Sequence, residues 1–170
     1  VVGFIVFRAG FPVAHPYAPG RAVDAIDFSP DGSLVALGGS KITIHAWRDG
    51  IGEKLLEIDE PAYPIIFGPN GILVTANGRS TIEVWQTKTG ELLRTFESHS
   101  SYPRVLSPDG KTLISIDHSG GKVIFWDIQK GEIMRTLDIA RNSDIALSAD
   151  GKLLALSEQP PVIQLRNPWT

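Results

Sequence analysis

Short apolar runs separated by turn-forming residues recur along the chain, and none shows the 3.6-residue period of an amphipathic helix. The clearest example is residues 107–137, where the turn sequence SPDG (Ser107–Gly110) precedes apolar runs at 112–116 and 122–126. Both runs are rich in β-branched and aromatic residues, which favour strands. In the turn, proline presets φ at the second position and glycine accepts the left-handed conformation that follows. The stretch therefore predicts β-strands joined by tight turns.

The same unit is repeated along the sequence, and three markers recur in step. The turn glycines are 39, 39 and 41 residues apart, at Gly32, Gly71, Gly110 and Gly151. A tryptophan near the end of the third run recurs at Trp47, Trp85 and Trp126, with Leu165 in the corresponding position of the fourth copy. A Gly-Glu pair lies five residues after each tryptophan. Agreement between three markers at one period predicts a repeat architecture.

This combination resembles the WD-repeat β-propeller family, with divergent repeats, over residues 21–167. The resemblance is carried by the SPDG turns, by Trp126-Asp127 and Val84-Trp85, and by the segment TGELLRTF at 89–96. It implies an all-β fold in which each repeat forms a four-stranded antiparallel blade and the blades stack around a central channel. Only Trp126 is followed by Asp, and the Asp usual in the turn between the second and third strands is replaced by Arg79 in one copy and Ser119 in another. We therefore expect the family's buried His–Ser–Trp–Asp network to be partial and to involve His99, Ser115 and Trp126.

We expect one propeller domain or propeller fragment with four recognisable blades. Blade 1 spans 21–60, blade 2 spans 61–100, blade 3 spans 101–140, and blade 4 spans 141–170 without its own outer strand. Residues 1–20 hold a spare outer strand, at 1–8, and a proline-containing loop. The spare strand could pair with blade 4 and close a ring, which would remove exposed strand edges. Alternatively, the four blades are an arc of a larger ring, completed by more chain or by a second copy; rings of this family mostly resemble seven-bladed ones, which favours the arc.

Composition limits the possible partners. The chain has 170 residues, of which 42% are hydrophobic and 21% charged, as in a soluble globular domain. Its net charge is −3 and its basic residues are scattered. They do not form the basic stripe that is expected of a nucleic-acid-binding surface. No apolar run reaches the roughly 18 residues that a membrane-spanning helix needs. Without cysteine, the chain has neither disulfides nor thiolate metal sites, and the compartment stays open.

No catalytic constellation stands out, so we expect a protein that is not an enzyme and that holds neither cofactor nor metal. The histidines lack metal-ligand spacing and are His15, His45, His99 and His118. Three aspartates lie in turns of different blades, which separates them too far for paired-carboxylate catalysis, and are Asp31, Asp109 and Asp150. We interpret the three tryptophans at Trp47, Trp85 and Trp126 as packing between neighbouring blades.

In the WD-repeat fold, the loops that precede each blade's first strand lie on one rim, together with the loops between second and third strands. The resemblance therefore places the candidate partner-binding residues on one face: Tyr63, Tyr102, Arg104, His99, Arg79, His118 and Arg141. Arg104 takes a position held by isoleucine in the other copies, at Ile26, Ile65 and Ile145. Tyrosine and arginine are favoured anchors of protein interfaces.

These features predict a non-catalytic scaffold module that binds protein partners through loops on one rim, the partner itself being unidentified. One alternative is an enzyme-associated propeller, either a hydrolase- or lactonase-like ring or the gating domain of a peptidase. Such rings usually hold convergent acidic, Asn or His side chains and a metal, a set that this sequence does not show. Another alternative is an arc that assembles with a second copy of itself.

Overall fold

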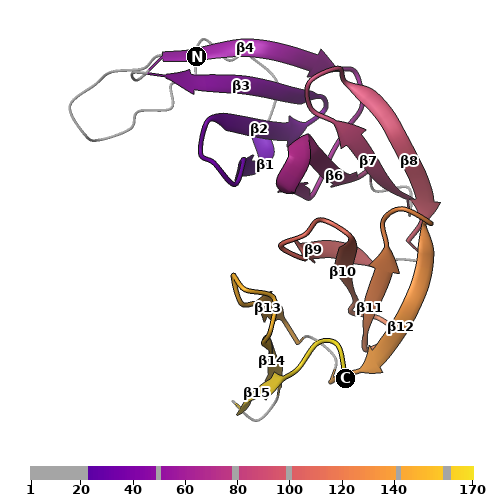
Figure 1. The fold of residues 1–170 in the computed structure, drawn as a ribbon. Helices are drawn as coiled ribbons and strands as arrows, with labels where there is room; N and C mark the ends of the chain where they lie inside the picture. The colour runs from indigo at the N-terminus through magenta and orange to yellow at the C-terminus, as the bar shows by residue number, and fades with distance from the viewer. Residues whose placement is uncertain (1–22, 49–50, 78–80, 99–100, 141–142, 159–161) are drawn as a thin grey trace.

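The computed structural model describes residues 23–48, 51–77, 81–98, 101–140, 143–158 and 162–170. In these residues the chain is built from strands, with one 3₁₀ turn, η1 (Pro69–Gly71). Four antiparallel sheets follow one another along the chain, and Figure 1 shows them side by side along an arc that does not close. The prediction of an all-β fold with four blade-like sheets is confirmed; the blade number of a complete ring stays a prediction.

The sheets divide the chain in sequence order, and each is a meander in which consecutive strands pair. Sheet 1 contains β1 (Val23–Phe28), β2 (Leu34–Gly39), β3 (Ile42–Arg48) and β4 (Ile51–Ile58). Sheet 2 contains β5 (Ile65–Phe67), β6 (Ile72–Ala76), β7 (Thr81–Gln86) and β8 (Glu91–Glu97). Sheet 3 contains β9 (Tyr102–Leu106), β10 (Thr112–Asp117), β11 (Lys122–Asp127) and β12 (Glu132–Asp138). Sheet 4 contains β13 (Ile145–Leu147), β14 (Leu154–Glu158) and β15 (Val162–Arg166).

The first strands β1, β9 and β13 lie on the concave side of the arc, and β4, β8 and β12 lie on its convex side (Figure 1). Among the described residues, sheet 4 has three strands and β15 is its edge. The spare strand expected at 1–8, and the whole of 1–20, lie outside the described residues. The division into blades at 21–60, 61–100, 101–140 and 141–170 remains an interpretation.

The core consists of three seams, each formed where two neighbouring sheets face one another. Side chains alternate between the two faces of a strand, so both faces of the inner sheets can be apolar and buried. Sheets 1 and 2 share a cluster that includes Ala36, Ile42, Ile44, Leu73 and Trp85. Sheets 2 and 3 share Val74, Ile82, Phe96, Leu113 and Trp126, and sheets 3 and 4 share Ile114, Val123, Phe125, Leu154 and Leu156. Each sheet is therefore stabilised by its neighbours.

The SPDG and SADG turns are closed by one repeated set of hydrogen bonds. The Ser29 hydroxyl donates to Asp31 Oδ1 at 2.6 Å and accepts from the Leu34 backbone N–H at 2.9 Å. The same pair of contacts recurs at Ser107 and Ser148. The donated hydroxyl hydrogen bond is the main reason why the pKa of Asp31 is lowered to about 2. The serine and aspartate side chains of these turns thus hold the local backbone by hydrogen bonds.

Gly32 and Gly110 end identical SPDG turns with φ of 70° and 72°, but only Gly110 lies against a neighbouring sheet. A Cβ atom on Gly32 would meet nothing within 4 Å, whereas one on Gly110 would lie 2.8 Å from Pro69 Cγ. We expect Gly32→Ala to cost about 1–2 kcal/mol, the price of a left-handed alanine. Gly110→Ala should cost more, because the proline ring of sheet 2 must also move. Urea unfolding of both variants measures the difference, and equal losses would contradict this contact between the sheets.

The strand register shows that the tryptophan marker was assigned to the wrong residue in sheets 1 and 4. The third and fourth strands of sheets 1, 2 and 3 share an irregularity before His45, Trp85 and Trp126, respectively. His45 therefore occupies the position equivalent to Trp85 and Trp126, and Trp47 lies two residues further on, opposite Gly52. In sheet 4, Leu154 pairs with Arg166 as Leu113 pairs with Trp126, so Arg166 rather than Leu165 takes this position. The cause in sheet 1 is a β3–β4 hairpin that continues past the irregularity to Arg48 and Ile51.

The two equivalent indoles are buried and satisfied by hydroxyl groups. Trp126 Nε1 donates to Ser115 Oγ at 2.7 Å, and Ser115 Oγ donates to Ser101 Oγ at 3.0 Å. Trp85 Nε1 donates to Thr75 Oγ1 at 3.0 Å. Ser115 and Trp126 thus form the expected part of a buried network, with Ser101 as a further member. His99, the other expected member, lies outside the described residues. Asp127 accepts backbone hydrogen bonds from Gln129 and Lys130.

Candidate partner-binding site

Three of the residues predicted to bind a partner lie together on one rim of sheet 3. Tyr102 and Arg104 belong to β9, the innermost strand, and His118 begins the turn between β10 and β11. The Tyr102 and His118 rings lie 6.4 Å apart between centroids, and Arg104 Nη2 lies 3.3 Å from His118 Nε2. Asp144, just before β13, joins them through a 3.7 Å contact between its Oδ1 and Arg104 Nε. We call Tyr102, Arg104, His118 and Asp144 the rim cluster.

Arg104 is the centre of the rim cluster. Its side chain is 40% exposed and that of Asp144 is 67% exposed, so their ion pair is screened by water and weak. A guanidinium carries five N–H donors, and these two contacts use a minority of them. His118 can accept from Arg104 only in the neutral form with its proton on Nδ1. Arg104 therefore retains donors that an incoming group can use.

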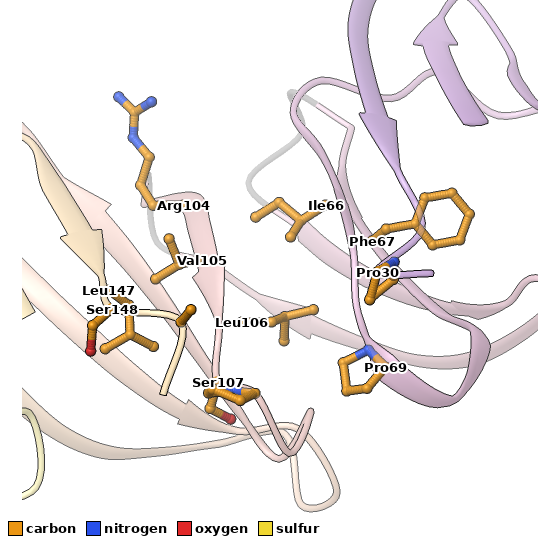
Figure 2. Close-up of a pocket in the computed structure, with 12 residues that line it drawn as sticks. Pro30, Ile66, Phe67, Pro69, Arg104, Val105, Leu106, Ser107, Leu147 and Ser148 are labelled. Atoms are coloured by element: carbon orange, nitrogen blue, oxygen red, sulfur yellow. The ribbon is translucent and has the colours of Figure 1, made fainter. Parts of the chain in front are cut away.

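A groove of about 400 Å³ runs from Arg104 along the concave side of the arc. Its walls come from three inner strands, β5, β9 and β13, and its far end from the SPDG-type turns. Figure 2 shows Ile66 and Val105 on opposite walls, Leu106 between them and the turn residues, and the guanidinium of Arg104 extending away from the turn. Arg104 is the sole charged residue among the twelve that line the groove.

A difference between equivalent positions explains why the groove lies here. Between sheets 1 and 2, Asp27 Oδ2 accepts the Phe67 backbone N–H at 2.7 Å and so links β1 to β5. Ile66 and Val105 take the place of Asp27 in the next two sheets, as their pairing with the second strands shows. An aliphatic side chain cannot accept a hydrogen bond from the neighbouring strand. Without such an acceptor, β5 is not linked in this way to β9, and β9 is not linked in this way to β13. The space between these inner strands stays open.

A family model described as "WD domain, G-beta repeat" matches residues 90–127, the stretch from the turn after β7 to the end of β11. This chain contains a WD repeat at residues 90–127. The match contains Trp126-Asp127, and the four meander sheets around it have the organisation of WD-repeat blades. We refer to sheets 1 to 4 as blades 1 to 4 from here on.

Three relatives illustrate the similarity. "Eukaryotic translation initiation factor 3 subunit I" of Pyricularia oryzae is 31% identical over 101 residues, which cover 56% of this chain and 30% of that protein. The protein of the same name from Aspergillus oryzae is 27% identical over 101 residues, with the same shares. "Topless-related protein 4" of Arabidopsis thaliana is 38% identical over 89 residues, 47% of this chain and 8% of that protein. The chain thus spans less than a third of the length of these relatives.

Of the other predicted binding residues, Tyr63 is described, and it does not join the rim cluster. Tyr63, before β5, is exposed, and its backbone N–H donates to Ala76 O at 2.8 Å. No ring contact or side-chain hydrogen bond joins Tyr63 to Tyr102 or Arg104 within the described part of the chain. His99, Arg79 and Arg141 fall outside the described residues, so their placement on this rim stays a prediction.

Two residues that shape the candidate site were not found from the sequence. Asp144 lies in a different repeat from Arg104, 40 residues along the chain, and no local pattern links the two. In the sequence, Asp27 looks like an ordinary polar residue of an edge strand. In the structure, it links blades 1 and 2. One available signal was that Asp27 breaks an otherwise apolar column of the repeat, where the other copies have Ile66, Val105 and Ala146.

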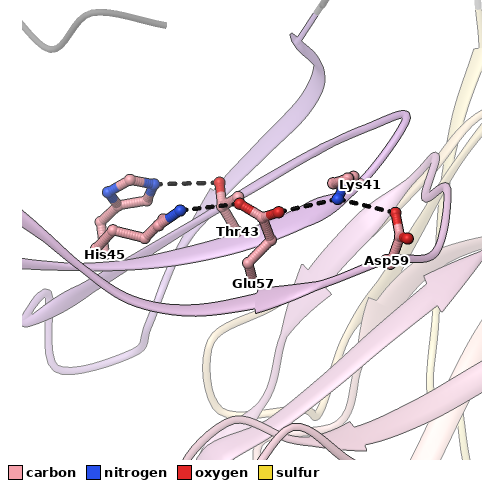
Figure 3. Close-up of polar contacts among 6 residues, drawn as sticks. Lys41, Thr43, His45, Glu57 and Asp59 are labelled. Atoms are coloured by element: carbon pink, nitrogen blue, oxygen red, sulfur yellow. Dashed lines mark hydrogen bonds and ion pairs between the residues drawn. The ribbon is translucent and has the colours of Figure 1, made fainter. Parts of the chain in front are cut away.

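The free face of blade 1 carries a charged network on its outer half (Figure 3). Lys41 Nζ lies 2.9 Å from Glu57 Oε1 and 3.0 Å from Asp59 Oδ1, and Lys54 Nζ lies 2.9 Å from Glu57 Oε2. The hydrogen bonds from Lys54 and Lys41 lower the pKa of Glu57 to about 2. Next to this network, His45 Nε2 lies 3.1 Å from Thr43 Oγ1. The carboxylates of Glu57 and Asp59 are exposed, so these ion pairs add little stability.

The described residues contain no group of three or more His, Cys, Asp or Glu side chains that could share a metal ion. In the same part of the chain, no helix is long and apolar enough to cross a bilayer. The contacts within the rim cluster are a hydrogen bond, an ion pair and an aromatic contact.

Proposed function

We propose that this chain is a non-catalytic protein-interaction module that binds its partner through the rim cluster and the groove beside it. The carrying observation is that Tyr102, Arg104 and His118, from two segments of blade 3, meet at the head of an apolar groove. WD-repeat proteins commonly act as scaffolds, and one of the relatives is by name a subunit of a larger factor. The names of these relatives do not identify the partner of this chain.

The physical basis is a rigid frame that presents a few anchor residues. The strand that carries Tyr102 and Arg104, β9, is held by the buried seams on both sides of blade 3, so little backbone freedom is lost when a partner binds. Tyrosine and arginine supply much of the binding energy in many interfaces, especially beside an apolar pocket. The groove supplies such a surface next to Arg104.

The absence of cysteine allows a site-specific crosslinking test. A single cysteine at Ser119, exposed beside His118, would carry a photo-crosslinker, and Lys130→Cys in the exposed turn between β11 and β12 would serve as the matched control. We expect a protein from a cell extract to crosslink at position 119 and not at 130. Combining Ser119→Cys with Tyr102→Ala, Arg104→Leu and His118→Ala should lower that yield about tenfold or more. An unchanged yield would remove the rim cluster as the binding site.

A second candidate role is assembly with further blades, since the free face of blade 4 presents exposed apolar side chains on β15. Ile163 is 73% exposed and Leu165 is 64% exposed. In this role the partner is another blade-like sheet, either from more of the same protein or from a second copy.

A further inference from the structure

We propose that the groove binds an extended peptide segment in which aliphatic side chains enter the groove and a carboxylate meets Arg104. This inference rests on the proposed interaction role and gives the chemistry of the partner at that site. The ligand class is an aliphatic peptide with one acidic residue, held in a β-like conformation along β9. Three features of the groove support it: an unused strand edge, an apolar lining and one positive charge.

The first feature is the backbone edge of β9. The Ser107 N–H bonds to Thr112 O, so in the alternating antiparallel ladder the next residue, Leu106, directs its own N–H and C=O away from β10. The equivalent N–H in β5, that of Phe67, is taken by Asp27. That of Leu106 faces Ile66 instead and has no acceptor among the described residues. An unpaired strand edge is the surface to which extended peptides add as a further strand.

The second feature is the lining. Ile66 and Leu106 lie at the inner end of the seam between blades 2 and 3, and Val105 and Leu147 at that between blades 3 and 4. All four side chains are partly exposed, and the turn prolines Pro30, Pro69 and Pro108 extend the apolar surface. A volume of about 400 Å³ is within the range of ligand-binding pockets. Alternate side chains of an extended peptide can therefore be buried here.

The third feature is Arg104, which fixes the charge of the ligand. Isoleucine is sufficient for folding at this position, because β1, β5 and β13 hold Ile26, Ile65 and Ile145 there. Guanidinium groups bind carboxylates through two parallel hydrogen bonds, a geometry that amides and ammonium groups cannot match. Asp144, which contacts Arg104 at 3.7 Å and is mostly exposed, competes with the incoming carboxylate and would be displaced by it.

The probe is an acetylated and amidated hexapeptide of alternating valine and threonine with one glutamate, made with the glutamate at either end because β9 can be paired in both directions. Matched peptides replace glutamate by glutamine, lysine or phosphoserine. Binding is followed by amide chemical shifts of the 170-residue protein at up to millimolar peptide. We expect one glutamate peptide to shift amides of β5, β9 and β13 and to bind about tenfold more tightly than its glutamine and lysine counterparts.

Three variants test the assignment to Arg104. Arg104→Leu should fold normally and abolish the preference for glutamate over glutamine. Arg94→Leu, on the exposed strand β8, is the matched control and should leave the preference intact. Asp144→Asn should strengthen binding of the glutamate peptide, because it removes the competing carboxylate. A purely structural role for Arg104 would predict no gain from Asp144→Asn.

Absence of shifts in the groove, equal affinity for glutamate and glutamine peptides, or a preference that survives Arg104→Leu would each overturn the proposal. Binding of only the phosphoserine peptide would also overturn it and would assign a phosphorylated ligand. Failure of the broader role is distinguishable, since crosslinking at position 119 does not depend on the charge of the partner. A partner captured there that is unaffected by Arg104→Leu alone would leave the interaction role standing and refute the acidic ligand.

Discussion

Trp126→Ala should destabilise the chain by about 3–5 kcal/mol, the largest loss that we expect from any single substitution. Trp126 is 2% exposed and fills the seam between blades 2 and 3, with its ring centroid 5.3 Å from that of Phe96. Removing the indole leaves a cavity between two sheets and takes the hydrogen-bond donor from Ser115. Urea unfolding followed by circular dichroism measures the loss.

Two controls separate packing from other effects. Trp126→Phe keeps a ring in the seam and should cost markedly less than Trp126→Ala. Ile133→Ala changes the residue directly opposite Trp126 on β12, where the side chain is half exposed, and should cost about 1 kcal/mol. If Trp126→Ala cost no more than Ile133→Ala, Trp126 would not be a seam residue.

The second large effect is expected from Ile163→Asp combined with Leu165→Asp. In blades 1, 2 and 3 the equivalent pairs are buried, with exposures of 0% and 1% for Ile42 and Ile44, for Ile82 and Val84, and for Val123 and Phe125. In blade 4 the same positions are 73% and 64% exposed. We expect the wild-type chain to associate through this face as its concentration rises and the double variant to sediment as a monomer with unchanged stability.

The matched control is the same double change in blade 1, Ile42→Asp with Ile44→Asp, which should unfold the chain because it buries two charges in a seam. Analytical ultracentrifugation and binding of a hydrophobic dye compare the three proteins. A blade 4 variant that unfolds like the blade 1 variant would show that this face is covered within the monomer. Association that persists in the folded blade 4 variant would assign it to another surface.

Much of the fold was predictable because the local and repeated signals agree. The SPDG turns and the period near 40 predicted four copies of one strand-and-turn unit, and the runs at 112–116 and 122–126 correspond to β10 and β11. Burial of Trp85 and Trp126 followed from their place in the repeat. The position of Trp47 did not follow, because a hairpin can gain residues beyond its irregularity without changing the turn signals. The sequence does indicate the difference, because Trp47 and Trp85 are 38 residues apart, whereas Trp85 and Trp126 are 41 residues apart.

The rim cluster was predictable in part. The repeat brought Tyr102, Arg104 and His118 to one rim, since loops at the same stage of each copy lie on the same side. The contact with Asp144 was not predictable, because it depends on the distance between blades 3 and 4 and on a side chain from the next copy. The groove was also not predicted by any sequence pattern. It results from small differences between equivalent residues, an aspartate at Asp27 against the aliphatic Ile66 and Val105.

The central claim is that neighbouring blades stabilise one another through shared seams, and a double-mutant cycle between Phe96 and Trp126 tests it most directly. Phe96 lies on β8 of blade 2 and Trp126 on β11 of blade 3, so they can interact only if the two sheets pack face to face. We expect the losses for Phe96→Ala and Trp126→Ala to be non-additive, with a coupling energy of about 1 kcal/mol. Strictly additive losses, with a coupling of zero within error, would contradict the account.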